Sequence, residues 1–359
     1  MPSGFASNNL YWETEAPLQK GKPTVLFIHA SWMSSAMWEE TIQLLAPQLP
    51  EVNLLRVDLN GHGKTTAGRK EYTLWNQAED VLTLLRELEL SNVLIAAISM
   101  GSMIALRLVL LDQARFSGLV LLASNASEAT NAQRDAFYQL RDIWVATPAP
   151  SEQIMNAAIL SWGGNPDVEG PRATRIKQDW IQRHSGAENV EPTLTSMMER
   201  DAVLNRLGEF RVPVLLIHGE DDKTYPLQDA VEIKERLVNA DVRLEVVKDE
   251  GHLLIHLREA KDVAEWIQGF VQKCERNRQR SCNTDFHSLS FAESPSLSSS
   301  KFDYFKYLLD VHEIFRVHIA SLQHADQLQI VTILDIQDIL QSCNRSRFQT
   351  KRYHAIASI

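Results

Sequence analysis

The chain has 359 residues, of which 44% are apolar and 23% are charged, and its formal net charge is −10. This composition excludes a disordered, collagen-like or disulfide-framework protein, and the acidic balance argues against a nucleic acid as a partner. The averages hide a break, because all 15 Gly and all 8 Trp precede residue 270, whereas the three Cys lie from Cys274 onward. Residues 276–359 hold 10 basic and 8 acidic groups, so they carry +2 and residues 1–275 carry −12.

Short apolar runs rich in Val, Ile and Leu alternate with longer segments of helical period. The runs are Pro23–Ile28, Val52–Val57, Asn92–Ile98, Gly118–Leu122, Pro213–Ile217 and Val242–Val247. The helical segments are Met37–Leu49, Thr73–Leu90, Ser102–Leu111, Leu227–Val238 and Leu257–Val271. Hydrophobicity that is continuous within a run is typical of parallel strands covered on both faces. We therefore predict an α/β protein with a doubly wound, mostly parallel sheet.

The alternation is interrupted between two of these runs, over about residues 125–211. This stretch is too long for a connector, so we predict a helical subdomain, or lid. An insertion at this point lies above the carboxyl ends of the strands, where α/β sheets bind ligands. Its residues Trp144, Trp162 and Trp180 could form the core of the lid, with one or two of them facing a substrate; Trp144 and Trp162 are our candidates for substrate binding.

The composition changes after the last helical segment, which we expect to end near Val271. We therefore assign residues 1–275 to one domain and the Ser-rich residues 276–300 to a linker. Residues 301–359 regain apolar side chains and form a C-terminal extension that is either poorly ordered or folded into short helices. Three interpretations of this tail stay open: an extension of the domain, the product of a wrong gene model, or a module that binds a partner.

Targeting signals are sparse. Met1–Pro17 lacks the basic and apolar regions of a secretory signal, and the most apolar segments are too short to cross a bilayer. The three Cys match no metal pattern and cannot all pair, which favours a reducing compartment. The chain ends in Ala357-Ser358-Ile359, a poor match to a peroxisomal address. We expect a cytoplasmic protein without a membrane span, either a monomer or a homodimer.

The sharpest local motif is Ala97-Ile98-Ser99-Met100-Gly101, between a predicted strand and a predicted helix. A serine at such a turn is forced into a strained conformation that exposes its hydroxyl above the sheet. Small residues are needed two positions before and after it, because the strand and helix backbones pass close together there. Ser99 is therefore the candidate nucleophile.

A serine hydroxyl needs a base to take its proton, and the base needs a carboxylate to fix its tautomer. His252 follows the last strand-like run and is our candidate base. Asp221 and Asp222 both follow the preceding run; we prefer Asp222, which lies three residues beyond Gly219.

The oxyanion of the reaction requires two backbone N–H groups. We expect one from Met100, at the N-terminus of a helix, and the other from Ser31, in the loop after the first long strand. Trp32 is expected to wall the pocket and to contact the substrate. His29 and Asp58 also end strands, but we interpret them as residues that order loops.

Together these residues resemble the α/β-hydrolase superfamily over roughly residues 9–273, in the order Ser99, Asp222, His252. The motifs that carry the resemblance are His29-Ala30, Asp58-Leu59-Asn60-Gly61-His62-Gly63, residues 97–101, Gly219-Glu220-Asp221-Asp222 and Gly251-His252. The resemblance implies the α/β-hydrolase fold with a lid after the sixth core strand, followed by a tail outside the family. It is greatest to serine esterases and lactonases, including the 3-oxoadipate enol-lactonase type and hydrolases of fungal secondary-metabolite clusters.

The resemblance implies a serine hydrolase that cleaves a carboxylic ester or lactone of a small, mostly apolar molecule through an acyl-enzyme, with secondary metabolism as one setting. Two alternatives stay open: a carbon–carbon hydrolase or lyase with the same triad, and a protein that binds a hydrophobic ligand without catalysis. We predict no cofactor, since the chain has no Gly-rich phosphate loop. We predict no metal either, because the pair His252 and His256 has helical spacing without the adjoining glutamate or a third ligand.

Overall fold

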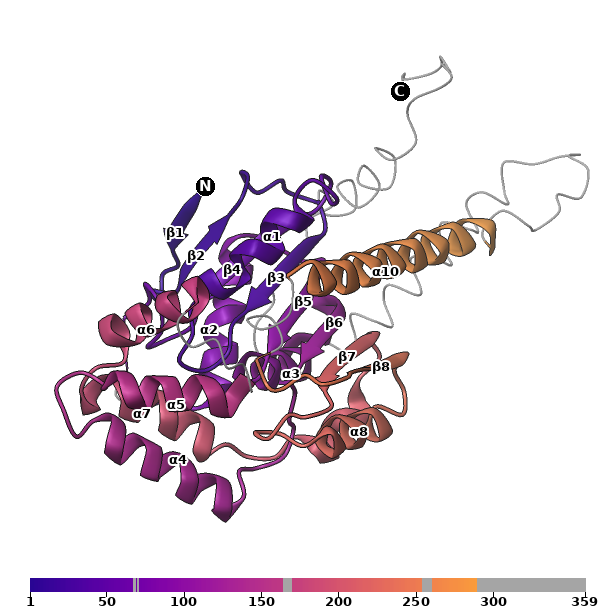
Figure 1. Cartoon of the computed structure of the whole chain (residues 1–359). Helices are drawn as coiled ribbons and strands as arrows, with labels where there is room; N and C mark the ends of the chain where they lie inside the picture. The colour runs from indigo at the N-terminus through magenta and orange to yellow at the C-terminus, as the bar shows by residue number, and fades with distance from the viewer. Residues whose placement is uncertain (67–68, 70, 164–169, 254–259, 289–359) are drawn as a thin grey trace, which may run out of the picture. The chain divides into compact units, whose positions relative to one another are not determined.

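A computed structural model describes residues 1–66, 69, 71–163, 170–253 and 260–288 (Figure 1). The chain divides into two units, Met1–Ser281 and Cys282–Ile359, and the account below concerns the first. The extension predicted at 301–359 and much of the predicted linker lie outside the described residues.

The core is an eight-stranded sheet in the order β1-β2-β4-β3-β5-β6-β7-β8. The strands are β1 (Ser3–Phe5), β2 (Tyr11–Thr14), β3 (Thr24–Ile28), β4 (Asn53–Asp58), β5 (Val93–Ile98), β6 (Phe116–Leu122), β7 (Val214–Gly219) and β8 (Val242–Val247). β2 pairs antiparallel with β1 and β4, and the other neighbours pair in parallel. The predicted mostly parallel sheet is therefore confirmed, with β1 and β2 added at one edge.

Alternate residues of the central strands face two separate layers of helices. In β3, Leu26 and Ile28 pack in an apolar cluster with residues of α2, α3 and α8. Val25 and Phe27 of the same strand pack in a second cluster with residues of α1 and α10. These helices are α1 (Glu39–Leu45), α2 (Leu74–Glu87), α3 (Met100–Asp112), α8 (Leu227–Arg236) and α10 (Ala260–Ser288). Because side chains alternate along a strand, both faces of the sheet are buried at its central strands, as the continuous apolar runs predicted, whereas the edge strand β8 is largely half-buried or exposed.

The predicted lid is also present, inserted between β6 and β7. It consists of α4 (Asn131–Trp144), α5 (Glu152–Gly163), α6 (Pro171–Arg183) and α7 (Ala187–Met198). Within it α4 packs against α7 and α5 against α6 (Figure 1). Three short 3-10 helices, η1 (Ser35–Trp38), η2 (Gln113–Arg115) and η3 (Leu204–Glu209), complete the connections.

The last helix differs from the prediction, which ended it near Val271. In the structure α10 continues to Ser288. Its first half is fixed by apolar residues one and two turns apart, since Val263, Ile267, Phe270 and Val271 all pack against the sheet. The following residues, with several Arg and Gln, favour a helix intrinsically, and neither Gly nor Pro occurs between Val271 and Ser288 to end it.

Candidate active site

Ser99 occupies a strained turn between β5 and α3. Its backbone has φ 52° and ψ −121°, a conformation that residues with a side chain rarely adopt. A Cβ on Gly101 would lie 2.6 Å from the carbonyl oxygens of Ile28 and His29, so a glycine is required for α3 to approach β3 this closely. Ala97, on the strand side of the turn, is fully buried. The turn predicted from the sequence is thus present, with Ser99 at the N-terminus of α3.

His252 and Asp222 form a hydrogen-bonded chain with this serine. His252 Nε2 lies 2.9 Å from Ser99 Oγ, and His252 Nδ1 lies 2.8 Å from Asp222 Oδ2. Of the two aspartates left open by the sequence, the structure brings Asp222 to the histidine. Asp221 points elsewhere: its side chain is 59% exposed and lies 3.8 Å from Lys223 Nζ.

The second carboxylate oxygen of Asp222 is held by the backbone of its own loop. Oδ1 accepts the N–H groups of Thr224 (2.8 Å) and Tyr225 (2.9 Å). Burial by itself would raise the pKa of Asp222, but His252 and these hydrogen bonds outweigh it, so the pKa lies below its ordinary value. The carboxylate is therefore ionised and fixed in one orientation toward the histidine.

Two buried residues that the sequence did not single out support this pair. His218 Nε2 contacts the Tyr225 carbonyl oxygen at 2.8 Å and lies 3.5 Å from Asp222 Oδ2. The ring of Tyr225 meets the His252 ring edge-on, with 5.2 Å between the centroids. A tyrosine before a proline carries no local signal of such a role, so sequence reasoning missed it.

The predicted oxyanion residues lie on either side of Ser99. Ser31 follows β3 and lines the same cavity as Ser99, and its Oγ is buried without a hydrogen-bond partner in the described structure. Met100 is the first residue of α3, where backbone N–H groups have no partner within the helix. The loop is held by Trp32, whose backbone has φ 58° and whose carbonyl accepts the Trp180 Nε1–H at 2.7 Å.

His29 and Asp58 bind loop backbone, as predicted. His29 Nδ1 donates to the Ala30 carbonyl at 2.7 Å, and its Nε2 accepts the Leu59 N–H at 3.0 Å. Burial lowers the pKa of His29 to about 4, so the ring is neutral and can accept this bond. Asp58 accepts the N–H groups of Ser35 and Lys64, each at 2.7 Å.

The three tryptophans predicted to bind substrate lie in different environments. Trp32 and Trp162 both line the cavity at Ser99, with 6.0 Å between their ring centroids. Trp144 does not line it: the side chain is fully buried, packs against Trp32 at 4.8 Å, and donates from Nε1 to the His184 carbonyl at 2.8 Å. The predicted contact of Trp144 with substrate is therefore corrected: Trp144 lies behind Trp32 and supports it, where the lid meets the core.

The cavity at Ser99 is small, with a volume of about 30 Å³. Sequence reasoning missed most of its walls, since these come from remote segments. The lid contributes Phe137, Leu194 and Met197 in addition to Trp162, and the loops of the acid and base contribute Thr224, Tyr225 and Leu253.

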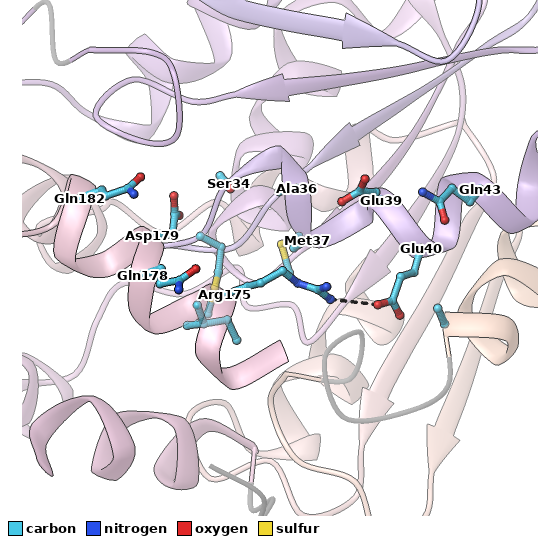
Figure 2. A pocket seen from close by; sticks show the side chains of 13 residues that line it. Ser34, Ala36, Met37, Glu39, Glu40, Gln43, Arg175, Gln178, Asp179 and Gln182 are labelled. Atoms are coloured by element: carbon cyan, nitrogen blue, oxygen red, sulfur yellow. Dashed lines mark hydrogen bonds and ion pairs between the residues drawn. The ribbon is translucent and has the colours of Figure 1, made fainter. Parts of the chain in front are cut away.

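A larger cavity of about 450 Å³ lies apart from these residues, between η1 and α1 on one side and α6 on the other (Figure 2). Its lining mixes polar and apolar side chains and includes an ion pair of 3.0 Å between Arg175 and Glu40. None of the predicted site residues lines it. Cavity size therefore does not locate the candidate active site, whereas the hydrogen-bonded chain does.

Within the described residues, no group of three or more His, Cys, Asp or Glu is arranged to hold a metal ion. None of the helices in that same part of the chain has the length and apolar character needed to cross a membrane.

Comparison with known proteins identifies the family of the chain. Residues 25–266 match the Alpha/beta hydrolase family, and the chain belongs to this family. The chain is similar to the AB hydrolase superfamily protein YisY of Bacillus subtilis, with 23% identity over 225 residues, which cover 62% of this chain and 82% of the relative. It is also similar to 3-oxoadipate enol-lactonase 1 of Acinetobacter baylyi, with 23% identity over 267 residues, covering 70% and 90% of the two chains.

A solved structure, the enol-lactonase from Burkholderia xenovorans, has a TM-score of 0.65 at 17% identity and covers 76% of this chain and 100% of its own. At that identity the likeness shows the fold alone. The resemblance drawn from the motifs is thereby confirmed for family and fold, and it makes the protein an alpha/beta hydrolase with lactonase relatives.

Proposed function

We propose that the protein is a serine hydrolase that cleaves a carboxylic ester or lactone through an acyl-enzyme. The observation that carries this proposal is the chain Ser99–His252–Asp222, with contacts of 2.9 and 2.8 Å. The family and the enol-lactonase relative of Acinetobacter baylyi support an ester-like bond as the target.

In the first half of the reaction, Ser99 Oγ attacks the substrate carbonyl carbon while His252 Nε2 takes the hydroxyl proton. Asp222 keeps the proton on Nδ1 before the attack and stabilises the imidazolium that forms. The negative charge moves to the carbonyl oxygen, where the N–H groups of Ser31 and Met100 stabilise it.

When this intermediate collapses, the bond to the leaving oxygen breaks and His252 Nε2 donates its proton to that oxygen. The acyl group is then bound to Ser99. Water attacks it in the second half, with His252 again taking a proton, and the acid is released while Ser99 is regenerated.

Replacing the nucleophile tests the proposal. We expect Ser99→Ala to lower the hydrolysis of ethyl acetate by about 10⁴-fold or more, because no other group can form the acyl-enzyme. A fluorophosphonate should add one equivalent to the wild type and none to the variant, as read by intact mass. If the variant keeps wild-type hydrolysis, the assignment is wrong. If the folded wild type fails to react yet still binds a hydrophobic ester, the protein is a binder rather than an enzyme.

A further inference from the structure

Next to the cavity at Ser99 lies an open groove on the lid. The groove has a volume of about 540 Å³ and runs between α4 and α5. Phe137, Trp162 and Thr224 line both spaces, so they stand at the junction between them. To lie in the groove, a chain attached to a carbonyl at Ser99 has to pass these three residues.

The groove is largely apolar, and small side chains line both of its walls. Ala132, Ala136 and Leu140 recur every four residues along α4, so they lie on one face of that helix. Ala157 and Ala158 face them from α5. The four alanines leave space between the two helices for an aliphatic chain.

The polar groups among the described lining residues are mostly engaged with the protein. Gln133 Nε2 donates to the Thr224 carbonyl at 3.3 Å, and Ser161 Oγ donates to the Ala158 carbonyl at 2.9 Å. The Lys223 side chain is 79% exposed and lies 3.8 Å from the Asp221 carboxylate. The groove therefore recognises its occupant by apolar contact rather than by a dedicated hydrogen bond.

The junction between the cavity and the groove lies on the same side as His252. This position determines which part of an ester enters the groove. The Trp162 carbonyl accepts the N–H groups of His252 (2.8 Å) and Leu253 (3.1 Å). Thr224 donates its N–H to Asp222 at 2.8 Å. Since His252 must protonate the leaving oxygen, that oxygen lies on this side of the carbonyl carbon, and the alcohol chain follows it into the groove.

The acyl group is left with the cavity at Ser99. At about 30 Å³ this cavity is far smaller than the groove of about 540 Å³, so the shorter half of the ester fits the cavity and the longer half fits the groove.

We propose that the substrate is an ester of a short carboxylic acid with a linear aliphatic alcohol, whose chain lies in the groove between α4 and α5. This proposal rests on the proposed serine-hydrolase function and adds to it the orientation and size of the two halves of the substrate.

Two isomeric esters test the orientation. Hexyl acetate and methyl heptanoate have the same atoms, and only the placement of the long chain differs. We expect kcat/KM to be at least about tenfold higher for hexyl acetate, the low end of what a few methylene contacts supply. A preference for methyl heptanoate would show that the groove does not hold the alcohol.

Filling the groove tests the location. Ala157 and Ala136 are exposed, so a larger side chain at either position does not disturb the core. We expect Ala157→Phe and Ala136→Phe each to lower kcat/KM for hexyl acetate about tenfold and to leave ethyl acetate within about twofold. Ala187→Phe, on the exposed start of α7 and outside the groove, is the matched control and should change neither.

The outcomes separate the two proposals. Unchanged hexyl acetate hydrolysis in both groove variants, with normal ethyl acetate hydrolysis, overturns the groove and leaves the serine hydrolase standing. An equal loss of kcat/KM for hexyl acetate and ethyl acetate also overturns the groove proposal, since the substitutions then act on the reacting atoms rather than on the alcohol chain. A wild type that reacts with the fluorophosphonate but hydrolyses none of the three esters overturns the alcohol-site proposal alone. A wild type that also fails to react with the fluorophosphonate contradicts the proposed function itself.

Discussion

Replacing Asp222 by asparagine tests its role in the chain Ser99–His252–Asp222, and the neighbouring Asp221 supplies a matched control. The Asp222 side chain is 0% exposed, and its Oδ2 lies 2.8 Å from His252 Nδ1. Asparagine keeps an oxygen that can accept the loop N–H groups of Thr224 and Tyr225. It removes the charge, however, and places an amide against the Nδ1–H, which favours the wrong tautomer of the histidine.

The expected loss follows from the charge separation. Two unit charges 2.8 Å apart interact by about 6 kcal/mol at an effective dielectric constant of about 20. This interaction exists when His252 is protonated during the attack and is weak while the ring is neutral. Its loss should lower kcat/KM by about 10⁴-fold, at 1.36 kcal/mol for each factor of ten.

We would measure kcat/KM for ethyl acetate with the wild type, Asp222→Asn and Asp221→Asn, and compare their melting temperatures. Asp221→Asn should stay within about twofold of the wild type, because its side chain is 59% exposed and solvent screens it. A folded Asp222→Asn within about tenfold of the wild type would refute the reasoning. An equal loss in both variants would also refute it, because the effect would then be nonspecific.

Two further predictions concern the buried residues behind the cavity. Burial lowers the pKa of His29 to about 4 and that of His62 to about 3, whereas the unfolded chain binds these protons near pH 6.5. The free energy of unfolding should therefore fall as the pH drops from about 6.5 toward 4, by about 1.4 kcal/mol per pH unit for each histidine. Urea unfolding at several pH values should give a shallower slope for His62→Gln, and an unchanged slope would contradict this. Trp144→Phe should lower the melting temperature, because the buried His184 carbonyl loses its donor at a cost of about 1–3 kcal/mol. It should leave KM for ethyl acetate unchanged; a raised KM at an unchanged melting temperature would restore Trp144 as a substrate contact.

The sheet could be predicted where both faces of a strand are buried, and not where strands depend on partners. β3 and β5 are buried at every residue, so their apolar runs identify them. β2 is only four residues long and carries Glu13, a pattern that predicts a loop rather than a strand. Its place becomes clear only in three dimensions, because Glu13 Oε1 lies 2.8 Å from Arg56 Nε, a buried cation of β4.

The sequence predicts the residues proposed to carry the chemistry of the candidate site, but not most of the residues that line its cavity. The reason is similar. Ser99 and Asp222 each follow a strand, and parallel strands bring their carboxyl ends to one edge of a sheet. Phe137 and Leu194 reach the cavity from lid helices, and no local pattern separates a helix face that lines a cavity from one that packs in a core. Trp144 and Trp162 differ in this way, although each lies at the C-terminal end of a lid helix.

The end of α5 explains why the groove suits substrate entry. The last carbonyls of a helix lack partners within it, and the carbonyl of Trp162 accepts the N–H groups of His252 and Leu253 instead. A movement that lifted α5 away from the core would break both bonds and free the base from its position at Ser99. Entry along the groove between α4 and α5 requires no such movement. The substrate can therefore reach Ser99 while the lid keeps His252 aligned, so the same helix that shapes the alcohol site also holds the base.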